Sequence, residues 1–156
     1  MILIQRPGQD SLEIEFILID FEGTLASDGR VHPKAKDKIN LLSKRTRIYI
    51  VVKTGRERAD EALRKVKAEI VYLTEGESSR RKAEVLQQIG PARTAVIGNG
   101  VDDALIVEEA ALGICVIGKE GALGETIKKA DVVVCDILDA LDFLLKPLRQ
   151  KATLGK

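Results

Sequence analysis

The chain has 156 residues, of which 45% are hydrophobic and 31% are charged. This composition is typical of one globular domain that buries a sizeable core beneath a charged surface. The formal net charge of +1 provides no strong field that would attract nucleic acid or an anionic membrane. We therefore expect one domain over residues 1–156 that binds neither nucleic acid nor a membrane.

The N-terminal sequence and the two cysteines bear on cellular location. MILIQRPGQD lacks the basic stretch, long apolar stretch and cleavage site of a signal peptide, and no apolar run approaches the roughly 20 residues of a membrane helix. We therefore expect a cytoplasmic protein. Cys115 and Cys135 lie in the apolar contexts ICVI and VVVCD, which favour core positions over metal ligands or catalytic thiols.

Short apolar runs rich in β-branched residues recur along the chain and predict strands. They cover Ile14–Ile19, Arg47–Val52, Glu69–Leu73, Thr94–Ile97, Gly113–Ile117 and Asp131–Val134. Met1–Gln5 is predicted as an additional edge strand, because the following residues 6–9 have the composition of a turn.

The segments between these strands carry apolar residues at helical spacing. The sets are Ala35, Ile39 and Leu42; Ala59, Ala62, Leu63 and Val66; Val85, Leu86 and Ile89; Leu123, Ile127 and Ala130; and Leu138, Leu141, Leu144 and Leu145. Alternating strands and helices predict an α/β fold, a doubly wound, Rossmann-like parallel sheet with helices on both faces. The core is expected over about residues 12–146. Pro147 is expected to end the last helix, leaving a tail at 147–156 with a loose end at 151–156.

Polar residues follow several of the predicted strands, where a parallel sheet binds its ligands. Asp20 ends the first core strand and Glu22 follows two positions later, so both side chains can leave the same side of an extended chain. Gly23 allows the backbone to turn tightly there. These features make Asp20 the candidate nucleophile.

Three further groups complete the candidate site. Thr54 and Gly55 follow the second core strand at the start of a helix, where a hydroxyl and backbone amides suit an anion. Lys82 lies near the start of the third helix as a point charge for phosphate, chosen over Arg81 on spacing alone. The turn GNGVDD at 98–103 supplies oxygen ligands of the kind that Mg²⁺ prefers. Together these groups predict a phosphoryl site.

In order and chemistry these segments resemble the four motifs of the haloacid dehalogenase (HAD) superfamily, DxDGT, Ser/Thr, Lys and GDxxxD or GDGxND. Their counterparts here are DFEGT, Thr54, Lys82 and GNGVDD. GNGVDDALIVEEAALGICVIG and ADVVVCDILDALDFLLKP are similar to the soluble P-type ATPase-like group of that superfamily. A second resemblance, in size and in the ASDGRV stretch, is to the phosphatases of 3-deoxy-D-manno-octulosonate 8-phosphate.

The resemblance implies a magnesium-dependent phosphatase in which Asp20 attacks phosphorus and forms an aspartyl phosphate. It implies that Mg²⁺ is held by Asp20, the backbone carbonyl of Glu22 and the last motif, through Asn99 and Asp103, with Asp102 contributing directly or through water. It also implies that the second motif and the lysine, Thr54, Gly55 and Lys82, bind the transferring phosphoryl oxygens.

Two residues depart from the motifs. Glu22 stands where the phosphatases have the aspartate that protonates the leaving group and later activates water, and its chain is one methylene longer. Asn99 stands where many relatives have a metal-binding aspartate, and a neutral amide adds no charge. An alternative is therefore a phosphoryl-ligand binding or regulatory protein with weakened catalysis. A dehalogenase is disfavoured, because the charged loops suit phosphate better than a haloalkyl group.

Each candidate also has a purely structural interpretation. Asp20 and Thr54 could be turn or cap residues, Lys82 could belong to a solvated helix start, and Asp102 and Asp103 could cap the helix that follows them. His32, before Pro33, is expected to be a surface residue. The chain leaves no room for a cap domain, so the resemblance implies an open site for a phosphorylated small or macromolecular substrate, and a homo-oligomer such as a tetramer.

Overall fold

The computed structural model describes residues 1–53, 55–74 and 76–155. Its centre is a six-stranded sheet in which every neighbouring pair of strands is parallel. In spatial order the strands are β10 (Val132–Val134), β9 (Leu112–Val116), β8 (Thr94–Gly98), β3 (Phe16–Asp20), β6 (Arg47–Val52) and β7 (Glu69–Tyr72). The predicted parallel α/β sheet is confirmed.

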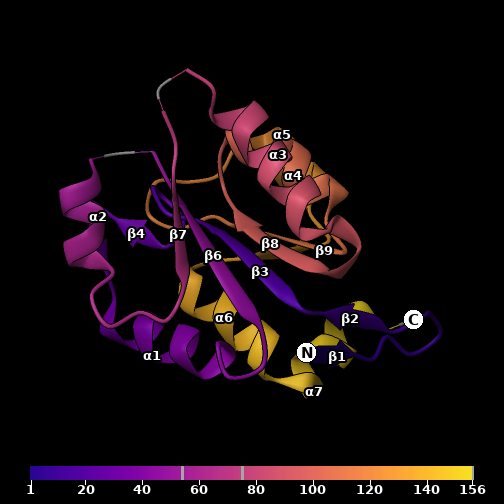
Figure 1. Ribbon diagram of the computed structural model, residues 1–156. Helices are drawn as coiled ribbons and strands as arrows, with labels where there is room; N and C mark the ends of the chain where they lie inside the picture. The colour runs from indigo at the N-terminus through magenta and orange to yellow at the C-terminus, as the bar shows by residue number, and fades with distance from the viewer. Residues whose placement is uncertain (54, 75, 156) are drawn as a thin grey trace.

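Helices cover both faces of this sheet (Figure 1). On one face lie α1 (Pro33–Leu42), α2 (Arg56–Ala62) and α6 (Ile137–Leu145), and on the other lie α3 (Ser78–Ile89), α4 (Ala104–Glu109) and α5 (Gly124–Lys129). Side chains alternate along each strand, so that Ile17 and Ile19 of β3 pack toward the first group while Leu18 packs toward the second. Burial on both faces explains why the strands read as continuous apolar runs.

The N-terminal segment forms a hairpin of its own, and the expected edge strand at Met1–Gln5 is wrong in this respect. β1 (Ile2–Ile4) pairs antiparallel with β2 (Leu12–Ile14) in a separate two-stranded sheet. The predicted strand Ile14–Ile19 is therefore divided at Glu15. The Glu15 backbone still bonds to the neighbouring chain, because its N–H donates to the Arg93 carbonyl and its carbonyl accepts from the Arg47 N–H.

Pro147 begins a helix instead of leaving a loose tail, because a proline suits the first turn of a helix as well as the position after one. This last helix, α7 (Pro147–Leu154), packs against α6 through the buried side chain of Gln150. Gln150 Nε2 donates to the carbonyls of Phe143 and Leu144, which end α6 without helical partners. The expectation of a loose end is wrong for residues 151–154.

Smaller differences concern single residues. Cys115 is buried as expected, but Cys135 is exposed, because it lies just beyond the short edge strand β10. Val66 lies beyond the end of α2 instead of within it. A two-residue hairpin follows the first motif, formed by β4 (Ala26–Ser27) and β5 (Arg30–Val31). None of the helices in the described ranges is long and apolar enough to span a lipid bilayer.

Candidate active site

Asp20 is the last residue of β3, an interior strand of the sheet between β8 and β6, and it is 5% exposed. The loop after it, residues 20–26, is closed by backbone bonds from the Leu25 N–H to the Asp20 carbonyl and from the Ala26 N–H to the Phe21 carbonyl. Gly23 has a φ of +77°, which a residue with a side chain rarely adopts. The segment DFEGT therefore forms a tight turn directly after Asp20.

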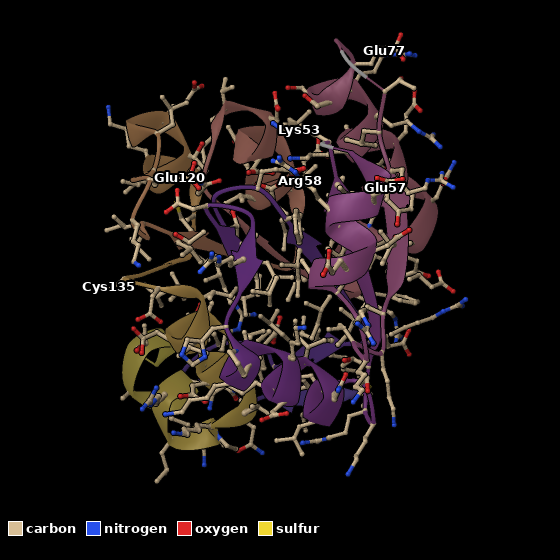
Figure 2. The ribbon with its side chains drawn as sticks, turned by 90° about the vertical axis from the view of Figure 1, so that its left-hand side faces the viewer. Lys53, Glu57, Arg58, Glu77, Glu120 and Cys135 are labelled. Atoms are coloured by element: carbon tan, nitrogen blue, oxygen red, sulfur yellow. The ribbon has the colours of Figure 1, made fainter. Side chains whose placement is uncertain are left out.

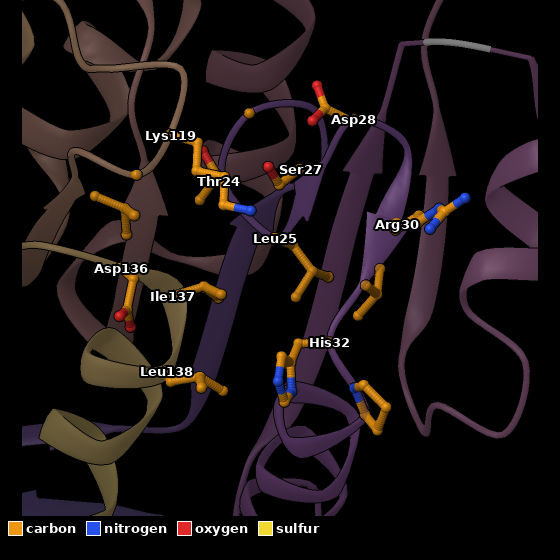
Figure 3. A pocket seen from close by; sticks show the side chains of 15 residues that line it. Thr24, Leu25, Ser27, Asp28, Arg30, His32, Lys119, Asp136, Ile137 and Leu138 are labelled. Atoms are coloured by element: carbon orange, nitrogen blue, oxygen red, sulfur yellow. The ribbon is translucent and has the colours of Figure 1, made fainter.

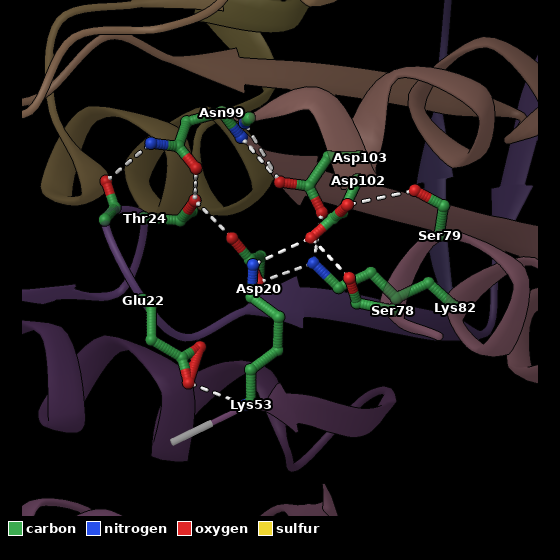
Figure 4. A network of polar contacts seen from close by, with 12 residues as sticks. Asp20, Glu22, Thr24, Lys53, Ser78, Ser79, Lys82, Asn99, Asp102 and Asp103 are labelled. Atoms are coloured by element: carbon green, nitrogen blue, oxygen red, sulfur yellow. Dashed lines mark hydrogen bonds and ion pairs between the residues drawn. The ribbon is translucent and has the colours of Figure 1, made fainter. Parts of the chain in front are cut away.

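Lys82 lies between two carboxylates at the centre of the site (Figure 4). Its Nζ is 2.8 Å from Asp20 Oδ1 and 2.8 Å from Asp103 Oδ1. The side chain is 1% exposed and comes from the second turn of α3, whereas neighbouring Arg81 pairs with Glu84 on the surface. The structure therefore brings Lys82, and not Arg81, to Asp20.

Asp103 is held from two sides. Its Oδ1 contacts Lys82, and its Oδ2 accepts hydrogen bonds from the backbone N–H groups of Asn99 at 3.0 Å and Gly100 at 3.1 Å. A Cβ added to Gly98 would lie 2.5 Å from Asp103 Cβ, so only glycine fits beneath this carboxylate. The motif GNGVDD thus encloses Asp103, which is 1% exposed.

Burial controls the charges in this cluster. It raises the pKa of Asp20 to about 8, and repulsion from Asp103 adds to the effect, while attraction to Lys82 opposes it. Burial alone would lower the pKa of Lys82, but attraction to Asp20 and Asp103 outweighs it and the pKa is raised. The ammonium is therefore charged at neutral pH and is shared by the carboxyl groups of Asp20 and Asp103.

Glu22 lies in the loop of residues 20–26, and its Oε1 accepts a hydrogen bond of 2.6 Å from the Lys53 backbone N–H (Figure 4). This contact joins the first motif to the end of β6. The Lys53 side chain continues the connection, since its Nζ is 2.8 Å from Asp102 Oδ2. A glutamate is long enough to reach the neighbouring strand end from this loop position.

Asp102 binds other partners than Asp103 does, although the two are adjacent in sequence (Figure 4). Its oxygens accept hydrogen bonds from Lys53 Nζ at 2.8 Å, Ser78 Oγ at 2.5 Å and Ser79 Oγ at 2.9 Å. Partial burial would raise its pKa, but these donors outweigh burial and lower the pKa to about 2. Asp102 therefore joins the ends of β6 and β8 to the first turn of α3, one turn before Lys82.

Asn99 occupies the centre of the loops after β8. Its Nδ2 lies 3.2 Å from the carbonyl oxygens of Gly23 and Gly121, and its Oδ1 accepts a hydrogen bond of 2.9 Å from Thr24 Oγ1. The Thr24 hydroxyl is in turn 3.2 Å from Asp20 Oδ2. The structure thus brings the predicted metal ligand Asn99 to the nucleophile loop, with its carbonyl oxygen directed to a hydroxyl.

The second motif is described only in part. Thr54, predicted to bind phosphoryl oxygens, lies outside the described residues. Gly55 is exposed and immediately precedes α2. Arg56, the first residue of α2, has its guanidinium carbon 4.2 Å from the centre of the Tyr72 ring. Lys53 and Arg58 add positive charge near this end of the sheet, and Figure 2 places both in the upper part of the molecule.

A pocket of about 650 Å³ opens beside the loop of residues 20–26 (Figure 3). Gly23 and Thr24 of this loop line it, together with Gly118 and Lys119 from the loop after β9. Its floor is mainly apolar, and polar side chains surround it, including His32. His32 is exposed and caps α1, as its Nδ1 accepts from the Lys34 N–H, which agrees with the expected surface position.

The oxygen donors near Asp20 suit a hard divalent cation better than a soft one. Asp20 Oδ2 has the displaceable Thr24 hydroxyl as its neighbour, and the Asn99 amide oxygen contacts the same hydroxyl. Both Asp103 oxygens are engaged with Lys82 and backbone N–H groups. Within the described ranges no three His, Cys, Asp or Glu side chains are grouped to hold a metal. Mg²⁺ therefore fits the donor chemistry, but few carboxylates are available to it.

Sequence reasoning did not select several residues that complete these networks. Thr24 and Gly121 join the loops around Asn99, and Ser78 and Ser79 bind Asp102. Thr24 could have been found from its place in DFEGT, and Ser78 from its position one helical turn before Lys82. Nothing in the sequence marks Gly121, whose backbone carbonyl is what matters.

The sequence comparisons place the chain near one curated relative. No protein-family model matches it. The uncharacterized protein MJ0073 of Methanocaldococcus jannaschii is 52% identical over 71 residues, which cover 45% of this chain and 76% of that protein. The name of that protein states no function.

Solved structures resemble the whole fold. The 3-deoxy-D-manno-octulosonate 8-phosphate phosphatase of Moraxella catarrhalis, in complex with magnesium, phosphate and its sugar acid, has a TM-score of 0.69 at 13% identity and covers 90% of this chain and 89% of that one. The cobalt-bound Haemophilus influenzae deoxy-D-mannose-octulosonate 8-phosphate phosphatase has a TM-score of 0.68 at 14% identity, covering 85% and 88%. A Bacteroides thetaiotaomicron phosphatase of the HAD superfamily has a TM-score of 0.63 at 10% identity, covering 85% and 95%. This chain therefore has the α/β core fold of the HAD superfamily phosphatases.

Proposed function

We propose that the protein is a magnesium-dependent phosphatase that hydrolyses a phosphomonoester through an aspartyl phosphate on Asp20. The observation that carries the proposal is the contact of one buried lysine, Lys82, with both Asp20 and Asp103 at the carboxyl ends of the sheet. A buried ionisable cluster of this kind at a ligand-binding edge is typical of a catalytic site. The fold shared with phosphatases supports the same reaction class.

In the first step an Asp20 carboxylate oxygen attacks phosphorus as the bond from phosphorus to the leaving oxygen breaks. A Glu22 carboxyl group donates its proton to that oxygen. In the second step water attacks the phosphorus of the aspartyl phosphate, Glu22 takes a proton from the water, and Asp20 and phosphate are released. Glu22 ends the cycle in its starting state.

Lys82 keeps positive charge beside Asp20 throughout, so that the anionic phosphoryl group and two carboxylates can share one site. Asp20, the Glu22 backbone carbonyl and the Asn99 amide oxygen would hold Mg²⁺, with Asp103 and Asp102 next to them. When bound, the ion neutralises charge on the phosphoryl oxygens. Thr54 and Gly55 are proposed to bind those oxygens from the second motif.

Two finer assignments belong to the same proposal. A sugar phosphate is a candidate substrate, because the neighbours named above include octulosonate phosphatases of similar fold. The soluble P-type ATPase-like group remains a prediction from GNGVDD and the sequence that follows it. We also propose a homo-oligomer in the cytoplasm, and light scattering that gives the mass of a monomer at micromolar concentration would remove the oligomer.

The direct test measures phosphate release from a generic aryl phosphate, with Mg²⁺ and with a chelator. We expect Mg²⁺-dependent release that falls at least about a thousandfold in Asp20→Asn, since the amide cannot act as the nucleophile. Asp142→Asn, which changes an aspartate between α1 and α6, is the matched control and should retain activity. Release that persists in Asp20→Asn would contradict the proposal.

A second candidate, a phosphoryl-ligand binding protein with weakened catalysis, is favoured by the engagement of Asn99 with Thr24, Gly23 and Gly121. Glu22→Asp separates the two. A large gain in turnover would mean that the natural protein is catalytically reduced, whereas no gain would mean that Glu22 already serves as acid and base. Phosphate binding without turnover in both proteins would support the binding function.

A further inference from the structure

We propose that the Asn99 side chain is a latch that holds the nucleophile loop, residues 20–26, to the loop after β9, residues 117–123, without a metal ion. Asn99 would thus be a positioning residue that assembles the site before any cation binds. The inference goes beyond the phosphatase proposal and rests on contacts alone, so it stands or fails independently of catalysis.

The orientation of the amide follows from its partners. The carbonyl oxygens of Gly23 and Gly121 only accept hydrogen bonds, so both hydrogens of Asn99 Nδ2 face them at 3.2 Å. Oδ1 then faces Thr24 Oγ1 at 2.9 Å. An aspartate has the same shape but cannot donate, and it would place oxygen against two carbonyl oxygens. The position therefore suits an amide and not a carboxylate.

The position of Asn99 in the sheet explains what it joins. Asn99 follows β8, and β8 lies between β3, which leads to Gly23, and β9, which leads to Gly121. The two flanking loops approach closely, since a Cβ on Gly118 would lie 3.6 Å from the Gly23 carbonyl oxygen. The backbone adds one bond, from the Leu123 N–H to the Asn99 carbonyl at 2.9 Å. The side chain alone spans all three strand ends.

The latch also affects the charge around Asp20. The Thr24 hydroxyl has one hydrogen and lies within reach of both Asn99 Oδ1 and Asp20 Oδ2. A carboxylate at position 99 would bring a third negative group to a cluster whose single buried cation, Lys82, is already shared by Asp20 and Asp103. The natural site therefore remains assembled without added cations, whereas an aspartate variant would require one.

The same two loops line one end of the pocket beside Asp20, where the side chains of Thr24 and Lys119 lie next to each other (Figure 3). Gly23 and Thr24 come from the first loop, and Gly118 and Lys119 come from the second. By joining these loops, the amide helps to fix the position of exposed Lys119. Opening of the latch should consequently expose the backbone near Lys119 to proteases.

The test compares Asn99→Asp, Asn99→Ala and the natural protein by thermal unfolding in chelator and in about 10 mM Mg²⁺. In chelator we expect both variants to lose about 4–8 °C in Tm, because the partly buried carbonyl groups of Gly23 and Gly121 lose their donors. Magnesium should restore most of the loss in Asn99→Asp and none in Asn99→Ala. The Tm of the natural protein should rise with Mg²⁺ by less than that of Asn99→Asp.

Limited trypsin digestion, with cleavage after Lys119 identified by mass spectrometry, reports the loop itself. We expect about tenfold faster cleavage there in both variants in chelator, with Mg²⁺ slowing it only in Asn99→Asp. Asn40→Asp is the matched control, because Asn40 also bridges two backbone groups, the Lys65 carbonyl at 2.9 Å and the Lys67 N–H at 2.8 Å. It should leave cleavage after Lys119 unchanged and insensitive to Mg²⁺.

Hydrogen exchange on the natural protein removes any dependence on variants that fold poorly. The amides of residues 118–123 should be equally protected in chelator and in Mg²⁺ if the latch acts without metal. Protection that appears only with Mg²⁺, or a Tm of the natural protein that rises as much as that of Asn99→Asp, would overturn the proposal. Wild-type cleavage after Lys119 in Asn99→Ala would do the same. No readout depends on turnover, so an inactive protein could still carry the latch.

Discussion

Two clusters of charge in this molecule combine aspartate with cations and behave in opposite ways. At the carboxyl ends of the sheet, Lys82 is shared by Asp20 and Asp103, and all three side chains are buried. Between α1, α6 and α7 a single aspartate, Asp142, faces three partly exposed cations, Lys38 at 2.6 Å, Lys146 at 3.6 Å and Arg149 at 3.7 Å.

The pKa values differ in direction. Burial and Asp103 raise the pKa of Asp20 to about 8, although Lys82 is in contact with it. The pKa of Asp142 is lowered, because hydrogen bonding and attraction from Lys38 and its other cations outweigh partial burial. A neighbouring cation therefore does not by itself keep a carboxyl group ionised, because desolvation and a second carboxylate can raise its pKa by more than the cation lowers it. The two clusters therefore differ in how far burial opposes the ionised form of the carboxyl group.

Removal of the buried cation should have the largest effect. We expect Lys82→Met to lower the free energy of unfolding by about 3–5 kcal/mol at pH 7, because it leaves the buried carboxyl groups of Asp20 and Asp103 without their cation. Without the ammonium, the folded-state pKa of Asp20 lies further above the value of about 3.9 in the unfolded chain, because the attraction to Lys82 that lowers it is lost. The loss should therefore grow as pH rises and shrink toward pH 4. Urea unfolding at several pH values measures it.

Arg81→Met is the control for that experiment. Arg81 is next in sequence but exposed, and it contacts Glu84 at 3.0 Å on the surface of α3. Its loss should change the free energy of unfolding by less than about 0.5 kcal/mol, without the same pH dependence. Equal effects of Lys82→Met and Arg81→Met on the free energy of unfolding would contradict the prediction that the buried lysine matters more than the exposed arginine.

An intermediate effect is expected at Asp102, which is only partly buried and accepts from Lys53, Ser78 and Ser79. Asp102→Asn should lower the free energy of unfolding by about 1–2 kcal/mol at pH 7. Since the folded-state pKa of about 2 is below the unfolded value, this stability is present above about pH 4 and is lost as pH falls toward 2. Ser79→Ala, which removes one donor, should cost less. A variant as stable as the natural protein at pH 7 would contradict the role of Asp102 as a connector.

The smallest effect is expected at the surface cluster. Asp142→Asn should lower the free energy of unfolding by about 0.5–1 kcal/mol at neutral pH, since exposed ion pairs contribute little. Its pKa is lowered in the folded state, so this stability is present above the unfolded value of about 3.9 and is lost as pH falls below it. The difference should shrink in 1 M salt, unlike that of Lys82→Met. Thermal unfolding at low and high salt tests this prediction.

Local pattern was sufficient for much of the fold. Every predicted strand of the main sheet is present within one residue at its ends, apart from the first, which begins two residues late and ends one late. Errors occurred where one local signal fits two structures. Pro147 suits the end of one helix and the start of the next, and Met1–Gln5 could pair with the main sheet or with its own hairpin partner. Contacts with the rest of the chain decide between such alternatives.

The sequence predicted which strand ends carry the residues of the candidate site, but not which of these residues contact one another. The positions of Asp20 and GNGVDD followed from strands that end in polar residues. Which neighbours contact which could not, because Asp102 and Asp103 are adjacent in sequence yet face Lys53 and Lys82, respectively. Successive residues at a helix start point in different directions, so Asp103 joins the buried cluster around Lys82 whereas Asp102 does not.

The sequence by itself determined the parallel α/β sheet, the helices of both faces and the edge of the sheet where polar residues gather, because apolar periodicity and turn residues are local properties. Only the tertiary structure decided that Lys82 is the buried cation, that Asp102 binds the start of α3, and that Asn99 joins Gly23 to Gly121. Those outcomes depend on desolvation and on backbone carbonyls brought together from distant strand ends, and neither is written in the identity of nearby residues.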